Sequence, residues 1–470
     1  MNQQTIIARR SGFSSWMRSM KNVALAGAAL VALSGAQANP VVPLIDAHYP
    51  HNSPSTSNKD IRGKLYVPPS HNQPGDTASY PLIIAFHGAN DYYHTGDKKS
   101  KNEPYSVFEK LLLRAEQEGF MVYMPQIVNA SAPGRWNFHQ IDNALRVVSR
   151  LSKDYRIDPK RIYLTGISLG GGGVWRAMYR YSGLTAASLP ICSSNSSTWN
   201  KDEFYGPMGD IPILTYHALN DSTVSHKDTE GHINAILKAK GVSAYSFPAT
   251  NGTATKIVFP LENITYHRLT TGGHGIWTSV YQMNDVYNWM LSHTNSRIGV
   301  LEVGESIYFD LGEDTPTVAV GTSNFEFGSA VRDNDGYLWN TNNYSNVVIG
   351  LNDCLIPYAK TTDGKQTVVS LDIEGGFADG FVALATGILY GDLGKDGFVT
   401  GTAISASNPA KLKIRGLTPG APYRVEIYGF HDNDDGGRGR HTTYQIGSQT
   451  TSLECAFNLD NTVVFQIGRA

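Results

Sequence analysis

Apolar and polar residues between about residues 60 and 295 follow two patterns that alternate along the chain. Short apolar runs rich in β-branched and aromatic residues are typical of buried strands, and apolar positions three or four residues apart are typical of helices. The runs that predict strands cover residues 64–68, 80–88, 121–126, 161–168, 188–194, 213–219 and 264–270. The stretches that predict helices cover residues 103–120, 140–153, the residues after 168, 228–240 and 278–292. This alternation predicts the α/β class, with a mostly parallel sheet covered by helices on both faces.

The pattern changes near residue 297. Beyond this point the helical periodicity ends, glycine and aspartate become more frequent, and short apolar runs follow one another between turn signals. We therefore predict an α/β domain over residues 39–297 and an all-β domain over residues 298–470, whose length favours a jelly-roll-like sandwich. Within the second domain, LTPGAPY (417–423) has the form of a tyrosine corner, in which a tyrosine hydroxyl bonds to backbone a few residues upstream.

The first 38 residues have the pattern of a cleaved secretory signal. Basic residues precede the apolar stretch at 23–36, which is followed by the small-residue pattern Ala36-Gln37-Ala38. About 14 apolar residues are fewer than the ~20 that a membrane-spanning helix needs. The sequence therefore predicts a secreted or periplasmic protein with no membrane span.

Charge and cysteine content narrow the classes of partner. The formal net charge is −2 and no basic run stands out, so binding to nucleic acid is not expected. Export permits disulfides, and of the three cysteines, Cys354 and Cys455 could form a bridge while Cys192 stands apart. No Cys/His spacing indicates a zinc site, so no metal is expected.

The pentapeptide GISLG places Ser168 between two glycines. It closes an apolar run and precedes a helical stretch, an order that is typical of a nucleophile elbow. A phosphate-binding loop is the alternative, but the segment lacks the Lys-Ser/Thr pair that such a loop requires. Ser168 is therefore the candidate nucleophile.

A serine nucleophile needs a base and an acid that orients the base. In this fold they follow in the order serine, acid, histidine, and Asp221 and His274 satisfy that order, each just after a predicted strand. Asp221 could instead cap the next helix. The acidic alternatives are Asp202, Asp210 and Asp228, and the histidine alternatives are His217, His226, His232 and His267. Because strands of a parallel sheet end at the same edge, Ser168, Asp221 and His274 are expected to meet there.

An attacked carbonyl also needs hydrogen-bond donors for its oxyanion. The backbone N–H of Leu169 is the first expected donor, and the second is expected from the loop after residue 88, at Ala89 or Asn90. His87, at the end of that strand, is interpreted as structural.

Residues 60–295 resemble the α/β-hydrolase esterases that are related to feruloyl and acetylxylan esterases and to polyhydroxyalkanoate depolymerases. The stretches that carry this resemblance are YPLIIAFHGAND, DPKRIYLTGISLGGGGVWRAMYRY, SLPICSS, the segment around Asp221 and GGHGIWTSVY. The resemblance implies ester hydrolysis without a cofactor, with Ser168 as nucleophile, His274 as base and Asp221 as orienting acid. Relatives often have a further glycine where this chain has HGAND, which leaves the second oxyanion donor open.

Aromatic residues near these segments are candidates for a substrate pocket. Trp277, Tyr92 and Trp136 are expected to bind substrate, although packing in the core is an alternative for each of them. The leading hypothesis is removal of feruloyl or acetyl groups from polysaccharide. A polyester depolymerase and, less favoured, a serine peptidase are the alternatives.

The terminal β domain could hold the enzyme on a polymer or serve as a spacer. The acidic runs at 333–336 and 432–437 could suggest calcium, but neither matches a full calcium loop and both are interpreted as solvated turns.

Overall fold

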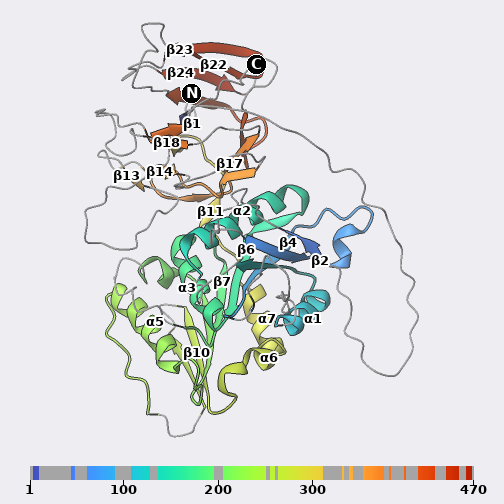
Figure 1. The fold of residues 1–470 in the computed structure, drawn as a ribbon, viewed down its shortest axis with the longest axis vertical. Helices are drawn as coiled ribbons and strands as arrows, with labels where there is room; N and C mark the ends of the chain where they lie inside the picture. The colour runs from blue at the N-terminus through green and yellow to red at the C-terminus, as the bar shows by residue number, and fades with distance from the viewer. Residues whose placement is uncertain are drawn as a thin grey trace.

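The computed structural model places an α/β region and a β region next to each other (Figure 1). It describes residues 4–9, 44–47, 61–89, 91, 107–127, 136–194, 205–249, 254–259, 263–310, 331–332, 338–341, 353–374, 380–382, 396–398, 411–428, 441–454 and 462–467.

The α/β region contains a nine-stranded sheet with the order β2-β3-β5-β4-β6-β7-β8-β10-β9. Its strands are β2 (Leu44–Asp46), β3 (Ile61–Tyr66), β4 (Tyr80–Phe86), β5 (Met121–Ile127), β6 (Ile157–Ile167), β7 (Ala187–Ile191), β8 (Ile213–Ala218), β9 (Thr255–Phe259) and β10 (Ile264–Leu269). Neighbours from β5 to β10 pair in parallel, whereas β2, β3 and β9 pair antiparallel at the two edges. The large, mostly parallel sheet predicted from the sequence is therefore present.

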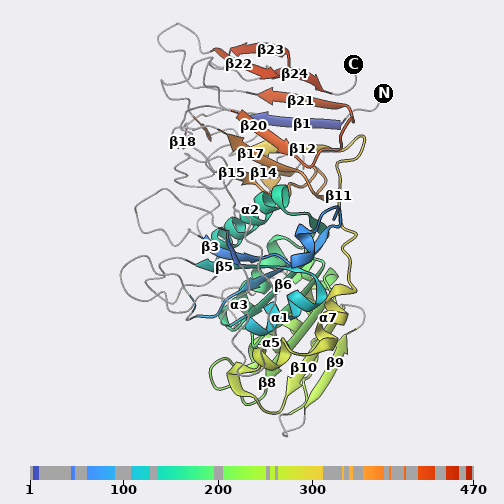
Figure 2. The same cartoon turned by 90° about the vertical axis from the view of Figure 1, so that its right-hand side faces the viewer.

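Helices cover both faces of this sheet (Figure 2). They are α1 (Glu109–Glu118), α2 (Phe138–Asp154), α3 (Leu169–Arg180), α5 (His226–Ala239), α6 (Trp277–Val280) and α7 (Asn284–Leu291). Buried residues of α2, α3 and α5 share one apolar core with Leu82, Ile84 and Phe86 of β4, and those of α1, α6 and α7 share a second core with Ile83 and Ala85. Successive β4 side chains therefore enter opposite cores, as the two-residue period of a strand requires.

The predicted elements differ from the observed ones in a few places. The helix expected over residues 278–292 is two helices, α6 and α7, separated by a turn at 281–283. The edge strands β2 and β9 were not predicted. Helix α2 begins with a capping box, because the Asn137 side chain accepts from the Gln140 amide and the Gln140 side chain accepts from the Asn137 amide.

After residue 297, every regular element in the described part of the chain is a strand. These are β11 (Ile298–Gly299), β12 (Ser306–Asp310), β13 (Val331–Arg332), β14 (Leu338–Thr341), β15 (Asp353–Ile356), β16 (Gln366–Thr367), β17 (Ser370–Glu374), β18 (Gly380–Val382), β19 (Asp396–Phe398), β20 (Lys411–Arg415), β21 (Tyr423–Tyr428), β22 (His441–Ile446), β23 (Gln449–Glu454) and β24 (Thr462–Ile467). Strands of a six-stranded sheet, β13-β14-β12-β1-β21-β24, and of a three-stranded sheet, β15-β17-β20, contribute to one apolar core. A jelly-roll sandwich stays a prediction.

The tyrosine corner predicted at 417–423 is confirmed. The Thr418 amide donates to the Tyr423 hydroxyl at 2.8 Å, so this side chain fixes the turn that leads into β21. The predicted bridge between Cys354 and Cys455 is not tested, since Cys455 lies outside the described residues. The same is true of the acidic runs at 333–336 and 432–437.

The N-terminal residues contribute one strand to the β region. Strand β1 (Gln4–Arg9) lies between β12 and β21 and pairs in parallel with both. Residues 10–43, which include the predicted apolar core of a signal peptide and its cleavage site, lie outside the described residues.

In the part of the chain that the structure describes, no helix is long and apolar enough to cross a membrane.

A buried carboxylate joins the two regions. Asp372 of β17 is 1% exposed and lies 2.7 Å from Lys153 of α2 and 2.6 Å from Arg415 of β20. Arg415 also donates to the Ser149 carbonyl at 2.8 Å, and the Ser149 hydroxyl donates to Ser370 at 2.9 Å. The β region therefore packs directly on α2, through polar as well as apolar contacts.

Candidate active site

Ser168 lies on a strained turn between β6 and α3. Its φ is 53° and its ψ is −117°, a backbone conformation that a non-glycine residue rarely adopts. A Cβ at Gly166 would clash with the Gly170 carbonyl, and a Cβ at Gly170 would clash with the Phe86 carbonyl. The two glycines of GISLG are therefore needed because β4, β6 and α3 approach one another closely at this turn.

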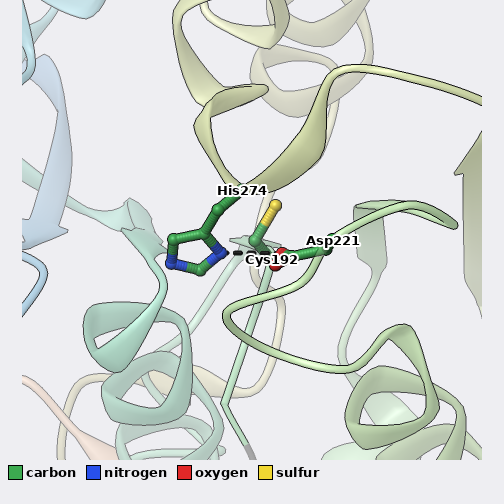
Figure 3. A group of neighbouring side chains, drawn as sticks. All are labelled: Cys192, Asp221 and His274. Carbon is green, nitrogen blue, oxygen red and sulfur yellow. Dashed lines mark hydrogen bonds and ion pairs between the residues drawn. The ribbon is translucent and has the colours of Figure 1, made fainter.

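The structure brings the three predicted residues together. The Ser168 Oγ lies 2.8 Å from His274 Nε2, and the Asp221 Oδ2 lies 2.7 Å from His274 Nδ1. Asp221 follows β8, and His274 lies in the 3₁₀ turn Gly273–Gly275 that follows β10. Figure 3 shows the imidazole of His274 pointing at the Asp221 carboxylate. This is the geometry in which a carboxylate orients an imidazole and the imidazole accepts a proton from the serine.

The Asp221 carboxylate is well supplied with hydrogen-bond donors. Its side chain has no exposed surface, and its Oδ1 accepts from the amides of Thr223 at 2.8 Å and Val224 at 2.9 Å. Burial alone would raise the pKa of Asp221, but the hydrogen bonds from His274, Val224 and Thr223 outweigh burial and hold this pKa below its ordinary value. The carboxyl therefore stays ionised at neutral pH.

Cys192 lies beside this pair. It directly follows β7, has a φ of 46° and is a buried free thiol. Its Sγ, a carboxylate oxygen of Asp221 and a nitrogen of His274 lie within 4.8 Å of one another (Figure 3), close enough to hold a metal ion. Burial and the neighbouring Asp221 charge raise the pKa of the Cys192 thiol, which keeps it protonated. Asp221 and His274 are already hydrogen-bonded to each other within the triad. We therefore interpret Cys192 as a neighbour of the triad.

The predicted oxyanion donors lie at the same edge of the sheet. Leu169 is the first residue of α3, so its amide has no intrahelical acceptor. Ala89 is exposed, and Asn90 lies outside the described residues. The Gly88 amide is not available, because it donates to the Asp91 carboxylate at 3.2 Å.

His87 has the structural role that was expected. Its Nε2 accepts from the Ile127 amide at 3.1 Å, so Nδ1 carries the proton and donates to the Gly88 carbonyl at 2.6 Å. Burial lowers the pKa of His87 to about 4, which keeps the ring neutral. His87 thus links the loop after β4 to β5.

The alternative histidines and acids lie elsewhere, with one exception. His232 faces the Tyr205 hydroxyl, His267 stacks on Tyr216 and His226 lies 4.0 Å from Glu230. Asp210 pairs with Lys240, Asp228 lies in the first turn of α5, and Asp202 is outside the described residues. The exception is His217, whose Nε2 lies 3.2 Å from the Asp221 carboxylate. The sequence indicates His217 only as an alternative base and gives no signal of this contact.

The three aromatic residues expected to bind substrate have different outcomes. Trp277 is half-buried, and its ring meets His274 edge-on with centroids 5.5 Å apart. Trp136 has no exposed surface, since its ring packs on Phe86 and its N–H donates to the His87 carbonyl at 3.1 Å. This corrects the expectation for Trp136, which is a core residue. Tyr92 lies outside the described residues.

The strand order, the strained serine turn and the Ser168–His274–Asp221 arrangement together define the α/β-hydrolase fold. Over 156 residues, the chain is 25% identical to the bifunctional acetylxylan esterase/xylanase of Neocallimastix patriciarum, a match that covers 33% of this chain and 21% of that protein. The chain thus spans about a fifth of the length of this curated relative. No family model matches the chain.

Solved structures of esterases are also similar to this chain. A thermostable esterase has 22% identity and a TM-score of 0.38, and the match covers 53% of this chain and 63% of that one. A ferulic acid esterase has 13% identity and a TM-score of 0.36, covering 51% and 95% of the two chains. The acetyl xylan esterase from Aspergillus awamori has 16% identity and a TM-score of 0.34, covering 49% and 93%.

Proposed function

We propose that this protein is a secreted serine carboxylic ester hydrolase that removes feruloyl or acetyl groups from polysaccharide. The observation that carries the proposal is the hydrogen-bonded series from Ser168 through His274 to Asp221, with spacings of 2.8 Å and 2.7 Å. The acetylxylan esterase/xylanase relative supports an acetyl ester and xylan as the substrate.

The reaction follows from this geometry. His274 Nε2 takes the proton of Ser168 as its Oγ attacks the ester carbonyl, and Asp221 holds the ring in the tautomer that leaves Nε2 free to accept. The oxyanion that forms is stabilised by the Leu169 amide, with Ala89 as the proposed second donor. His274 then returns its proton to the leaving alcohol. Water activated by the same imidazole releases the acid from Ser168.

The half-buried Trp277 is the proposed substrate contact, because it lies against His274 at the edge of the sheet where the serine is. An aromatic ring in this position could stack on a feruloyl ring or a sugar face.

Hydrolysis of several esters by the protein and by a Ser168→Ala variant tests the proposal. The substrates are feruloylated arabinoxylan, acetylxylan, polyhydroxybutyrate and short nitrophenyl esters. We expect ferulate or acetate release, with a loss of about 10⁴-fold or more in the variant. Release that survives Ser168→Ala would refute the nucleophile, and activity on the polyester alone would favour the depolymerase alternative.

Secretion and polymer binding belong to the same proposal. The predicted signal peptide ends at Ala38, so N-terminal sequencing of the exported protein is expected to start at Asn39. A start at or before Gln4 would contradict cleavage and retain the whole of β1. For the C-terminal region, the inactive Ser168→Ala protein is expected to sediment with insoluble polysaccharide, and failure to do so would favour a spacer role.

A further inference from the structure

His217 contacts the same Asp221 carboxylate that is hydrogen-bonded to His274. It is a residue of β8 whose side chain has no exposed surface. Its Nε2 lies 3.0 Å from the Val224 carbonyl oxygen and 3.2 Å from the Asp221 Oδ2. A carbonyl and a carboxylate can only accept hydrogen bonds, so His217 Nε2 carries a proton.

The other ring nitrogen of His217 is the end of a buried hydrogen-bonded series. The His217 Nδ1 lies 2.8 Å from the Thr229 Oγ1, which lies 2.9 Å from the Ser193 Oγ, and the indole Nε1 of Trp175 lies 3.0 Å from the same Ser193 oxygen. All four residues have 0% or almost no exposed surface. No solvent therefore competes for these groups.

The direction of this series follows from its first donor. An indole N–H can only donate, so Ser193 accepts from Trp175. Among the described contacts Thr229 is the acceptor that remains for the Ser193 proton, so the Ser193 hydroxyl donates to Thr229. The Thr229 hydroxyl then donates to His217 Nδ1, which must be unprotonated. Every donor of the series then has an acceptor, and the ring is the neutral Nε2–H tautomer.

The opposite direction is unfavourable. A doubly protonated His217 would donate from Nδ1 to Thr229 and turn the Thr229 proton toward Ser193. Ser193 would then accept from both Trp175 and Thr229, and its own buried proton would have no acceptor among the described contacts. Burial also lowers the pKa of His217, which agrees with the neutral ring.

From these contacts we infer that His217 is a positioning residue for the triad acid: its Nε2–H holds the turn at residues 221–224 beside His274, and the series from Trp175 fixes its tautomer. This inference rests on the proposed function, because Asp221 acts only through His274. Trp175 belongs to α3, the helix that begins directly after Ser168. The series therefore connects the nucleophile's helix with the acid's turn through Ser193 and Thr229.

A matched pair of variants tests the inference. His217→Met and His217→Gln have unbranched side chains of similar length, but only Gln keeps an N–H donor near the Nε2 position. We expect kcat/KM to fall about 10-fold or more in His217→Met with KM little changed, and to stay within about 3-fold of wild type in His217→Gln. His71→Met is the control, because His71 is a buried histidine that packs on Tyr80 at the amino end of β4.

The pH dependence of kcat/KM distinguishes a positioning role for His217 from a purely structural one, because a purely structural contact would not shift it. The titratable groups next to the Asp221 carboxylate are Cys192 after β7, His217 on β8 and His274, and His226 on α5 interacts with it electrostatically. Loss of the N–H beside Oδ2 raises the pKa of Asp221, so the acidic limb of kcat/KM is expected to move to higher pH in His217→Met and to return in His217→Gln. An unmoved limb in His217→Met counts against the inference.

A second pair of variants and a spectroscopic measurement guard against misfolding of the histidine variants. Thr229→Val removes the hydroxyl at constant shape and is expected to lower kcat about 3-fold to 10-fold, whereas Thr229→Ser keeps most of the activity. In the inactive Ser168→Ala protein, two-bond ¹H–¹⁵N spectra of histidine are expected to show His217 as the neutral Nε2–H form.

Failure of the inference and failure of the proposed function give different results. An Nδ1–H or doubly protonated His217, or equal activity in the Met and Gln variants, overturns the inference alone. Ester hydrolysis that survives Ser168→Ala overturns the proposed function, while the nitrogen spectra still report whether the series runs as inferred.

Discussion

The catalytic sheet and the C-terminal β region are built in different ways. In the first, six central strands run parallel, so Ser168, Asp221 and His274 all follow strands that end at one edge. In the second, sheet neighbours come from separate segments, as β17 lies between β15 and β20, and most of the described pairs are antiparallel. A parallel sheet gathers reactive side chains at an edge that sequence order can reveal. The described strands of the β region pair in both directions, so strand order alone does not predict which of their ends lie together.

The largest expected effect is a loss of catalytic activity that follows a substitution in the catalytic sheet but not one at the junction with the β region. His274→Gln removes the base that accepts the Ser168 proton, and kcat/KM is expected to fall about 10⁴-fold or more. Asp372→Asn, at the junction with the β region, is the control and is expected to leave kcat within about 2-fold of wild type. Steady-state hydrolysis of a nitrophenyl ester by both variants checks this, and a comparable loss in both would break the distinction.

The parts predicted from sequence are those in which a local pattern determines the outcome. Strand β4 was expected over 80–88 and covers Tyr80–Phe86, because its buried apolar run is continuous. The order of Ser168, Asp221 and His274 reflects the topology of the sheet, and the tyrosine corner reflects a local turn. These features depend on contacts within a few residues or on strand order alone.

The missed parts depend on packing between distant segments. The sequence around Trp136 would be the same whether this residue lined a pocket or filled the core. Its ring contact with Phe86 and its hydrogen bond to the His87 carbonyl show that it is a core residue. His217 lies inside a strand pattern, so its contact with Asp221 four residues later is visible only in three dimensions. The turn that separates α6 from α7 interrupts a continuous apolar periodicity and could not be read from it.

The next largest effect concerns a buried ion pair inside the catalytic region. Asp142 of α2 accepts from Arg180 of α3 at 2.9 Å and from the Tyr181 hydroxyl at 2.8 Å, and both charged side chains are buried. Asp142→Ala leaves the Arg180 charge unpaired, and the free energy of unfolding is expected to fall by about 3–5 kcal/mol. Urea unfolding followed by circular dichroism measures it. A loss below about 1 kcal/mol would show that Arg180 finds another partner or solvent.

A smaller effect is expected at the junction between the regions. Burial would raise the pKa of Asp372, but hydrogen bonds from Arg415 and Lys153 outweigh it and hold this pKa below its ordinary value. The stabilisation is therefore present above the ordinary pKa of the carboxyl and is lost as pH falls through the lowered one. Asp372→Asn is expected to cost about 1.5–3 kcal/mol at pH 7. Unfolding measured from pH 7 downward should show a difference between variant and wild type that shrinks as pH falls through the lowered pKa of Asp372, and a difference of the same size at every pH would exclude this cause.

The smallest expected effect is a gain in the free energy of unfolding, from a substitution at Asp91 in the loop after β4. Burial raises the pKa of Asp91 to about 6, although the hydrogen bond from the Gly88 amide works against this rise. A carboxyl with a raised pKa stabilises the fold below its ordinary value, and this contribution is lost as pH rises through about 6. Asp91→Asn can still accept from Gly88 but never ionises, so at pH 8 the variant is expected to be about 1–2 kcal/mol more stable than wild type. Near pH 4 the two should unfold alike. If Asp91→Asn is instead less stable at pH 8, the hydrogen bond from the Gly88 amide must be stronger to the charged carboxylate than to a side-chain amide. The ionised Asp91 would then help to fix the conformation of the loop that carries the proposed oxyanion donor.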